Sequence, residues 1–150
     1  MSIETKRGYY PDGQLEWERN YEKGKLHGLQ RMYYPDGQLE WESNYKDGEL
    51  YGLEQGWYEN NQLKFQWNWE KRKLHGLCRE WYPDGQLSCE VNYENGELHG
   101  PKREYYPDGQ LKEESNWENG ELHGLSRWRY GNGQLNLEEN WENGKIIKQS

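Results

Sequence analysis

Residues 27–50 read HGLQRMYYPDGQLEWESNYKDGEL, and variants of this 24-residue pattern follow one another along the chain without an insertion. The dipeptide Gln-Leu marks each copy, from residues 14–15 to residues 134–135, at a constant spacing of 24 residues. Self-similarity at a fixed period is the signature of a repeat architecture. The sequence therefore predicts one repeat domain over residues 1–150, with units at about 3–26, 27–50, 51–74, 75–98, 99–122 and 123–146.

Two turn signals recur in the repeats. Pro-Asp-Gly occurs at 11–13, 35–37, 83–85 and 107–109, and Asp-Gly or Asn-Gly occurs at 47–48, 95–96, 119–120 and 143–144. The runs between the turns hold about seven residues and are rich in Tyr and Trp, so they favour strands over helices. Both turn types suit β-hairpins. We expect an all-β fold, an open, twisted, antiparallel single-layer β-meander of six 24-residue hairpin repeats with about twelve strands.

The strand register follows if both loops are three residues long, because odd-numbered residues of every unit then share one face. One predicted face gathers Leu29, Tyr33, Leu39, Trp41 and Tyr45, and the other gathers Gln30, Tyr34, Gln38, Glu42, Asn44 and Leu50. Cys78 and Cys89 would point to opposite faces in this register. We therefore expect free thiols and no disulfide.

The composition is too polar for a large globular core. Only 31% of the 150 residues are hydrophobic, with nine Trp and thirteen Tyr against one Phe, and the formal net charge is −8. Amphipathic aromatic side chains suit a half-buried surface. The acid excess argues against nucleic-acid and anionic-membrane partners, which require clustered Lys and Arg, and favours a basic partner. No run is apolar enough for a membrane helix, so we expect a soluble, cytoplasmic protein.

Candidate chemistry is sparse. Histidines in equivalent positions lie two strands apart, about 9.6 Å, which is too far to share one zinc ion. The same spacing separates the glutamates of one column, so they do not form a glycosidase pair. An arginine column is expected to pair with neighbouring Glu or to stack on aromatic rings. No phosphate loop or nucleophile elbow is present. We therefore predict no catalytic residue, no metal and no cofactor, and a protein that is not an enzyme.

Positions that change between repeats are candidates for partner contact, since constant positions usually serve stacking. Three changing columns are strongly aromatic through the first two thirds of the chain, and exposed aromatic patches resemble interface hot spots. These rings could equally pack along the sheet itself. The candidate partner-binding residues are Trp17, Tyr33, Trp41, Trp57, Phe65, Trp67, Trp81 and Tyr105.

The elements Tyr-x-Asp/Asn-Gly-Gln-Leu and Asn-aromatic-x-Asn/Asp-Gly-x-Leu recur from about Arg7 to Ile146. In these elements the chain resembles the variant MORN repeat of bacterial proteins, in particular the YwqK-type antitoxin family. The resemblance implies an open, curved sheet of hairpins and cytoplasmic neutralisation of a toxin by direct binding. The third unit departs from the pattern, with Glu59-Asn60-Asn61 in place of Pro-Asp-Gly and Arg72 in place of the turn glycine.

The leading functional hypothesis is an antitoxin or immunity-type inhibitor that sequesters a partner toxin through its aromatic face, and the acid excess favours a basic toxin. The alternative is a structural protein that assembles through its open sheet ends. Lipid binding ranks third, because anionic membranes attract basic segments and this chain is acidic.

Overall fold

The computed structural model describes residues 2–149 and contains strands and turns, with no helix in that range. The expected all-β, antiparallel hairpin fold is confirmed. Two compact units can be distinguished, Met1–Lys73 and Leu74–Ser150. Each is described by itself below.

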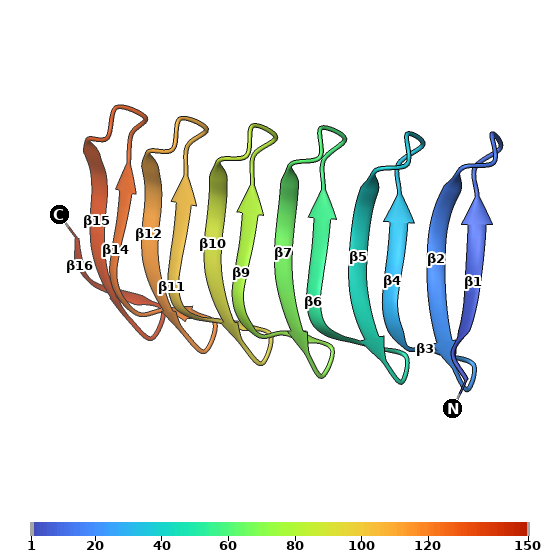
Figure 1. Ribbon diagram of the computed structural model, residues 1–150. Helices are drawn as coiled ribbons and strands as arrows, with labels where there is room; N and C mark the ends of the chain where they lie inside the picture. The colour runs from blue at the N-terminus through green and yellow to red at the C-terminus, as the bar shows by residue number, and fades with distance from the viewer. Residues whose placement is uncertain (1, 150) are drawn as a thin grey trace. The chain divides into compact units, whose positions relative to one another are not determined.

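The first unit is an open antiparallel meander in which strands follow the chain order (Figure 1). Pairing runs β1-β2-β4-β5-β6-β7, and the two-residue strand β3 pairs with β2. The strands of this unit are β1 (Glu4–Tyr9), β2 (Leu15–Glu22), β3 (Lys25–Leu26), β4 (Gly28–Tyr33), β5 (Leu39–Lys46), β6 (Glu49–Trp57) and β7 (Leu63–Glu70).

The second unit repeats this arrangement, with the order β9-β10-β11-β12-β14-β15-β16 and with β13 paired to β12. The short strand β8 (Lys73–Leu74) precedes it. The strands of this unit are β9 (Gly76–Trp81), β10 (Leu87–Glu94), β11 (Glu97–Tyr105), β12 (Leu111–Glu118), β13 (Glu121–Leu122), β14 (Gly124–Arg129), β15 (Leu135–Glu142) and β16 (Lys145–Gln149).

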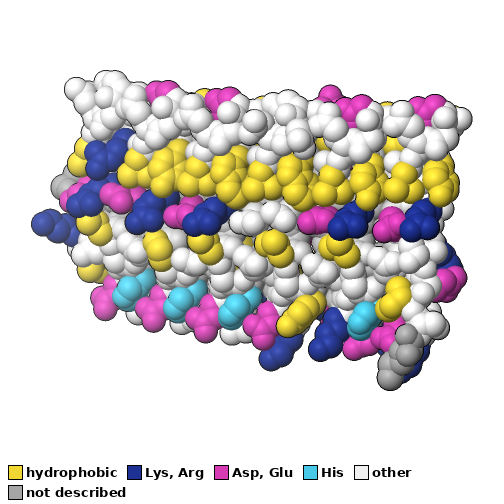
Figure 2. Space-filling view, in the orientation of Figure 1, with side chains coloured by type: hydrophobic (Ala, Val, Ile, Leu, Met, Phe, Trp, Pro, Cys, Tyr) yellow, Lys and Arg dark blue, Asp and Glu magenta, His cyan; other side chains and the backbone are white. Residues whose placement is uncertain are grey.

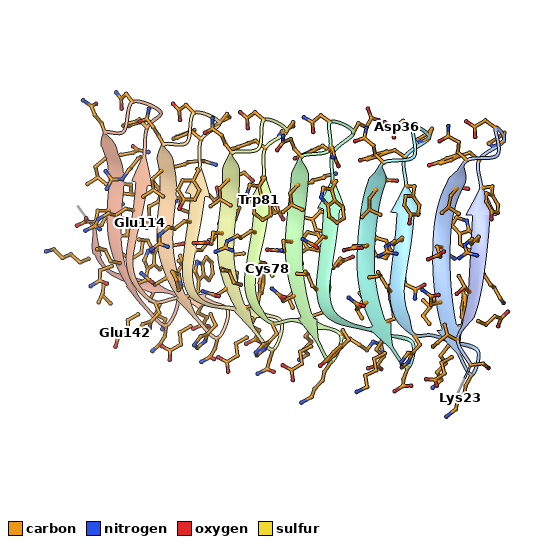
Figure 3. The ribbon with its side chains drawn as sticks, viewed as in Figure 1. Lys23, Asp36, Cys78, Trp81, Glu114 and Glu142 are labelled. Atoms are coloured by element: carbon orange, nitrogen blue, oxygen red, sulfur yellow. The ribbon has the colours of Figure 1, made fainter. Side chains whose placement is uncertain are left out.

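The two turn signals form different loops at opposite ends of the strands, as Asp36 and Lys23 show in the first unit (Figure 3). The Pro-Asp-Gly loop has three residues, closed by the Tyr34 N–H donating to the Gln38 carbonyl at 2.8 Å. The other turn has only two, since Lys46 pairs with Glu49 across Asp47 and Gly48, which have φ of 54° and 88°. Positive φ at both central residues defines a type I′ turn, which Asp-Gly favours.

The expected register is therefore wrong. The two-residue turn makes odd residues of one strand pair with even residues of the next, and a bulge beside each Pro-Asp-Gly loop keeps the same offset. Directly paired residues share a face of the sheet. Met32 pairs with Trp41, and Arg31 with Glu42. Trp41 and Tyr45 accordingly share a face with Gln30, whereas Leu29 and Tyr33 share the other with Glu42 and Asn44.

The placement of the cysteines on opposite faces is wrong for the same reason. Cys78 pairs with Val91, and Cys89 pairs with Glu80, so both thiols project from one face. The structure records both cysteines as free.

Bends at three His-Gly dipeptides, which split strands into β3/β4, β8/β9 and β13/β14, together with the extra strand β16, explain why residues 2–149 form sixteen strands and not about twelve. Gly28 has a φ of 78°, and the strand after the two-residue turn breaks there into β3 and β4. The side chain of Gln30, only 2% exposed, closes the break. Its Oε1 accepts the Asn20 N–H, and its Nε2 donates to the carbonyls of Asn20 and Gly28, each at 3.1 Å.

Hydrogen bonds from one repeat to the next hold the hairpins together at both strand ends. At the Pro-Asp-Gly end, the Tyr10 hydroxyl donates to the Tyr33 carbonyl at 2.6 Å, and the Tyr34 hydroxyl donates to the Trp57 carbonyl at 2.7 Å. At the other end, the Gly48 N–H donates to the Leu26 carbonyl at 2.8 Å. Tyr82 and Tyr106 repeat the first contact in the second unit at 2.7 and 2.8 Å.

Neither unit encloses a hydrophobic core. Among residues 2–149, Cys78 is the only hydrophobic residue classed as buried, while Gln30, Ser43, Glu54, Ser115, Ser126 and Glu139 are buried polar residues. Stability must therefore come from half-buried side chains along the two sheet surfaces. Figure 2 shows one surface, where a hydrophobic band lies beside a row of Arg and Glu.

We call this surface the ion-pair face. The arginine column pairs with glutamate, as expected: Arg7 with Glu18 and Arg127 with Glu138 at 2.7 Å. The row is completed by Arg31–Glu42, Arg79–Glu90, Arg103–Glu90 and Arg127–Glu114. The glutamates are therefore ion-pair partners and not a free acidic surface.

Removal of one tyrosine hydroxyl should destabilise the fold. Tyr34→Phe loses a part-buried bond to the next repeat, and we expect a loss of about 1 kcal/mol in the free energy of unfolding. Urea unfolding followed by circular dichroism measures it. The matched control is Tyr130→Phe, because Tyr130 is 53% exposed and its hydroxyl has no partner within the described part of the chain. Equal losses for both variants would contradict this role for Tyr34.

The irregular third repeat should contain removable backbone strain. Arg72 occupies the turn-glycine position with a φ of 65°. The left-handed conformation destabilises a non-glycine residue by about 1–2 kcal/mol. The ion pair of Arg72 with Glu49 is exposed and 3.7 Å long, so it offsets little of this cost. We expect Arg72→Gly to stabilise the protein by about 1 kcal/mol in urea unfolding. Asn61→Gly, at φ 63°, should gain less, because Asn tolerates this conformation. A destabilised Arg72→Gly variant would refute the assignment.

Candidate protein-binding face

The face opposite the ion-pair face is aromatic in the first unit. Trp17 lies on β2, Trp41 on β5, and Phe65 and Trp67 on β7. The cross-strand pairs Gly8–Trp17, Met32–Trp41, Trp41–Gly56 and Gly56–Phe65 place these rings on one side of the sheet. We call this surface the Trp face; it comprises Lys6, Gly8, Trp17, Arg19, Tyr21, Gln30, Met32, Trp41, Ser43, Tyr45, Glu54, Gly56, Phe65, Trp67 and Trp69.

Large rings on the Trp face lie over glycines on the neighbouring strand. A methyl group placed on Gly56 would lie 2.3 Å from the Phe65 ring, and one on Gly8 would lie 2.1 Å from the Trp17 indole nitrogen. Any side chain at these positions would displace the ring. Phe65 also stacks on Trp67, with ring centroids 4.3 Å apart. The rings thus lie against the backbone and remain half-buried, with one side accessible to solvent.

A buried carboxylate joins two of the tryptophans. Glu54, 8% exposed, accepts the indole N–H of Trp41 at 2.7 Å and that of Trp69 at 2.6 Å. The two donors come from β5 and β7, which flank the β6 strand of Glu54. Charge-assisted hydrogen bonds of this kind hold the side chains in one orientation. Glu54 is therefore a positioning residue for Trp41.

Two cations lie at the β1–β2 side of the Trp face. The Arg19 guanidinium lies 4.6 Å from the Trp17 ring centre, and the Lys6 ammonium lies 5.0 Å from that of Tyr21. Lys6 and Arg19 are direct cross-strand partners, and like charges in such positions repel. Lys6 has an exposed 3.5 Å contact with Glu4. Arg19 has no carboxylate partner in the described residues.

A groove of about 290 Å³ opens on this face between the first and second repeats. Its lining residues are Arg19, Leu26, Gln30, Arg31, Met32, Trp41 and Tyr45. It combines aromatic walls with the Arg19 side chain, whereas the Arg31 side chain is paired with Glu42 on the ion-pair face. The free cationic group in the groove is that of Arg19.

The structure divides the eight predicted partner-binding residues between the two faces. Trp17, Trp41, Phe65 and Trp67 share the Trp face, as shown by their pairing. The other four lie on the ion-pair face, before the three-residue loops; they are Tyr33, Trp57, Trp81 and Tyr105. Their expected placement on one face with the first four is wrong, because it relied on the odd-numbered register. Contact of any of the eight with a partner stays a prediction.

Sequence reasoning placed Tyr45 on one face with Trp41, but it missed Gln30, Met32 and Glu54 as parts of the same surface. The signal that could have found them was the Asp-Gly dipeptide itself, which prefers a two-residue loop. With that loop length, even residues of β4 and β6 face the odd residues of β2, β5 and β7.

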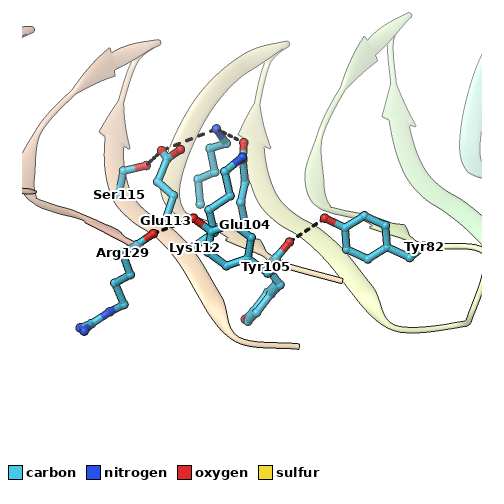
Figure 4. A network of polar contacts seen from close by, with 9 residues as sticks. Tyr82, Glu104, Tyr105, Lys112, Glu113, Ser115 and Arg129 are labelled. Atoms are coloured by element: carbon cyan, nitrogen blue, oxygen red, sulfur yellow. Dashed lines mark hydrogen bonds and ion pairs between the residues drawn. The ribbon is translucent and has the colours of Figure 1, made fainter. Parts of the chain in front are cut away.

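The corresponding face of the second unit carries a cluster of charged side chains beside Trp117 and Trp128. Lys102 contacts Glu104 at 2.7 Å and Glu113 at 3.6 Å, and Lys112 reaches Glu104 at 3.0 Å (Figure 4). Ser115 donates to Glu113 at 3.0 Å. Burial opposes the charged forms, but the hydrogen bonds and charges within the group lower the pKa of Glu104 and raise that of Lys102. Both groups are therefore charged at neutral pH and poorly suited to proton transfer.

Cys89 lies on the same face of the second unit. Burial raises the pKa of its thiol to about 11, and the carboxylate of Glu104 adds to this, while Lys102 opposes it. A thiol with such a pKa is almost entirely protonated at neutral pH. It lacks the thiolate character of a nucleophilic cysteine.

Cys89 should therefore react slowly with thiol reagents in the folded protein. At pH 8 about one molecule in a thousand carries the thiolate, and Cys78 is only 2% exposed. A disulfide-exchange reagent such as dithiobisnitrobenzoate should modify the two cysteines rapidly in urea and at least about tenfold more slowly without it. The native rate should rise with pH up to about 11. Immediate labelling of one thiol in native protein at pH 7 would contradict the raised pKa.

Metal chemistry has no support in residues 2–149, where no three His, Cys, Asp or Glu side chains are grouped to hold an ion. His27, His99 and His123 lie by the two-residue turns, 3.5–3.6 Å from Glu22, Glu94 and Glu118. The part of the chain that the structure describes has no helix long and apolar enough to cross a membrane.

Comparison with known families confirms the repeat. A family model described as MORN repeat variant matches residues 26–47, 50–71, 74–95, 98–119 and 122–143. The chain belongs to the MORN repeat variant family. Each match starts at the leucine after a two-residue turn, so one family repeat holds a bent strand, a Pro-Asp-Gly-type loop and the following strand. No curated protein matches the chain.

The MORN repeat variant is not known as an enzyme family, and its repeats occur in proteins that bind partners or membranes. In this chain the first matched repeat contains Met32, Trp41 and Tyr45 of the groove. The family repeat thus builds the groove together with Arg19 from the preceding hairpin.

Proposed function

We propose that this MORN-variant chain is a non-catalytic, protein-binding repeat protein that holds a partner against its Trp face. The observation that carries the proposal is the half-exposed cluster of Trp17, Trp41, Phe65 and Trp67 on a single-layer sheet. Tryptophans at accessible, pre-oriented positions are the commonest anchors of protein interfaces. Their hydrogen bonds and glycine contacts keep them in place before a partner arrives, which lowers the entropic cost of binding.

The charge distribution favours a basic partner. The first unit has eleven Lys and Arg against thirteen Asp and Glu, a net charge of −2, and the second has eight against fourteen, a net charge of −6. An acidic second unit would accelerate encounter with a basic protein. Apolar anchors in the first unit would then determine how long the complex lasts.

Within this class, an antitoxin or immunity-type inhibitor acting in the bacterial cytoplasm is our specific proposal. The resemblance of residues 7–146 to YwqK-type repeats and the acid excess support it. Inhibition would require only that the Trp face cover the working surface of the toxin. Membrane binding is disfavoured by the same acid excess.

Self-assembly is the second candidate function. Strand β16 is exposed along its length, with Ile146 at 48% and Ile147 at 58%, and β1 is almost equally exposed. Open strand edges pair readily with other chains. Light scattering over a range of concentrations separates the two functions, because assembly raises the mean mass with concentration whereas a dedicated inhibitor keeps a constant mass.

Partner capture tests the proposed function. The tagged protein should retain one basic protein in stoichiometric amount from the native host, and the complex should reduce the toxicity or activity of that protein. Trp67→Ala should weaken the affinity at least about tenfold, because it removes a stacked ring from the Trp face. Arg19→Glu should also weaken it, because it removes the exposed guanidinium that lies 4.6 Å from the Trp17 ring centre.

Tyr51→Ala is the matched control, because Tyr51 is a 54% exposed aromatic residue at the bend by Gly52 and outside the Trp face. Circular dichroism confirms that each variant is folded. Full affinity in both Trp67→Ala and Arg19→Glu would show that the Trp face is not the interface.

A further inference from the structure

The groove between the first two repeats has a composition that specifies its ligand. Apolar and aromatic walls are supplied by Met32, Trp41 and Tyr45, and Arg19 supplies a cation at the same opening. The volume of about 290 Å³ is near the lower limit for small-molecule sites, which suits one large side chain. We infer that this groove binds an acidic peptide segment, with an aromatic side chain inserted and a flanking carboxylate on Arg19.

The charge on this side of the groove is uncompensated in the free protein. Lys6 and Arg19 face each other across β1 and β2, a like-charge pair that costs free energy. Lys6 is only weakly neutralised by exposed Glu4, and Arg19 has no carboxylate partner in residues 2–149. A carboxylate of the ligand would relieve this repulsion. The Glu54 carboxylate on the Trp face already accepts hydrogen bonds from two indoles, so it is not available to pair with Arg19.

The aromatic walls are pre-oriented. Glu54 fixes the Trp41 indole, and the Gln30 amide, bonded to the backbone at the bend, forms a rigid, polar part of the wall. The Arg19 guanidinium lies 4.6 Å from the Trp17 ring centre and the side chain is exposed, so its N–H groups are accessible to a carboxylate. An aromatic ring next to a carboxylate therefore matches the groove better than a basic or neutral segment.

The inference deepens the proposed function, because the segment would belong to the protein partner. A basic partner and an acidic segment are compatible, since the first unit carries this cationic site while the second carries most of the acid excess. The partner would need opposite charges in two places, and this arrangement would fix its orientation.

Three blocked pentapeptides test the groove without any partner. They are acetyl-Gly-Glu-Phe-Glu-Gly-amide and its analogues with Gln or Lys in place of Glu. Titration is followed by the indole N–H resonances of ¹⁵N-labelled protein. The Glu peptide should shift the Trp41 and Trp17 signals saturably and bind about fivefold more tightly than the Gln peptide, and the Lys peptide should bind least. Equal affinities, tighter binding of the Lys peptide or shifts confined to the second unit would overturn the inference.

Arg19→Gln should abolish the preference for the Glu peptide while retaining the weak binding of the Gln peptide. Lys64→Gln is the matched control, since it removes one exposed positive charge from β7 of the same unit, outside the groove. A preference that survives Arg19→Gln, or one that Lys64→Gln removes, would overturn the assignment of the cationic site to Arg19.

Anionic vesicles of phosphatidylserine and phosphatidylcholine distinguish a peptide from a lipid ligand. We expect the protein to remain unbound in flotation. Flotation that depends on Arg19 would show that the site serves a membrane and would overturn the peptide inference. Absence of peptide binding would reject the groove alone, because capture of a partner through Trp67 is measured separately and would still support the proposed function.

Discussion

The hydrogen bond from a tyrosine hydroxyl to the backbone of the next repeat is the contact on which the rest of the structure depends. A single-layer sheet has no interior, so a hairpin can be positioned only by its neighbours. Tyr10 and Tyr34 tie consecutive hairpins at one strand end, and the Gly48 N–H ties them at the other. Burial, followed by the charge of nearby carboxylates, raises the pKa of Tyr34 and keeps the hydroxyl a donor at neutral pH.

This mode of stabilisation assigns different roles to the two faces. The ion-pair face repeats nearly the same contacts along the chain, with Arg7–Glu18 matched by Arg79–Glu90 and Arg127–Glu138; the third hairpin differs, because Gln55 pairs there with Gln66. The opposite face changes from Trp41 and Phe65 in the first unit to Cys89 and Glu113 in the second. Contacts that must recur to propagate the sheet use the first face, which leaves the second free to vary with a partner.

The same architecture limits the chemistry. The groove on the Trp face is open. In the second unit, Lys102 and Lys112 keep the Glu104 carboxylate ionised at neutral pH, and the raised pKa of Cys89 keeps its thiol protonated. Binding by an extended surface of rigid aromatic side chains is what such a sheet is suited to do. Preorganisation by Glu54 and by the glycines under Trp17 and Phe65 gives that surface a defined shape.

The sequence by itself determined the repeat, its period, the strands and the three-residue Pro-Asp-Gly loops, because these depend on local backbone preferences and on a spacing that one chain displays. It also indicated the Arg–Glu pairing. The tertiary structure decided which side chains share a face. One loop is a residue shorter than expected, and the bulge at Tyr33 preserves the resulting offset, so Trp41 joins Gln30 and separates from Tyr33. Successive side chains of a strand point to opposite faces, so one residue more or less in a turn moves every side chain of the next strand to the other face. Composition and repeat period do not reveal the length of a turn.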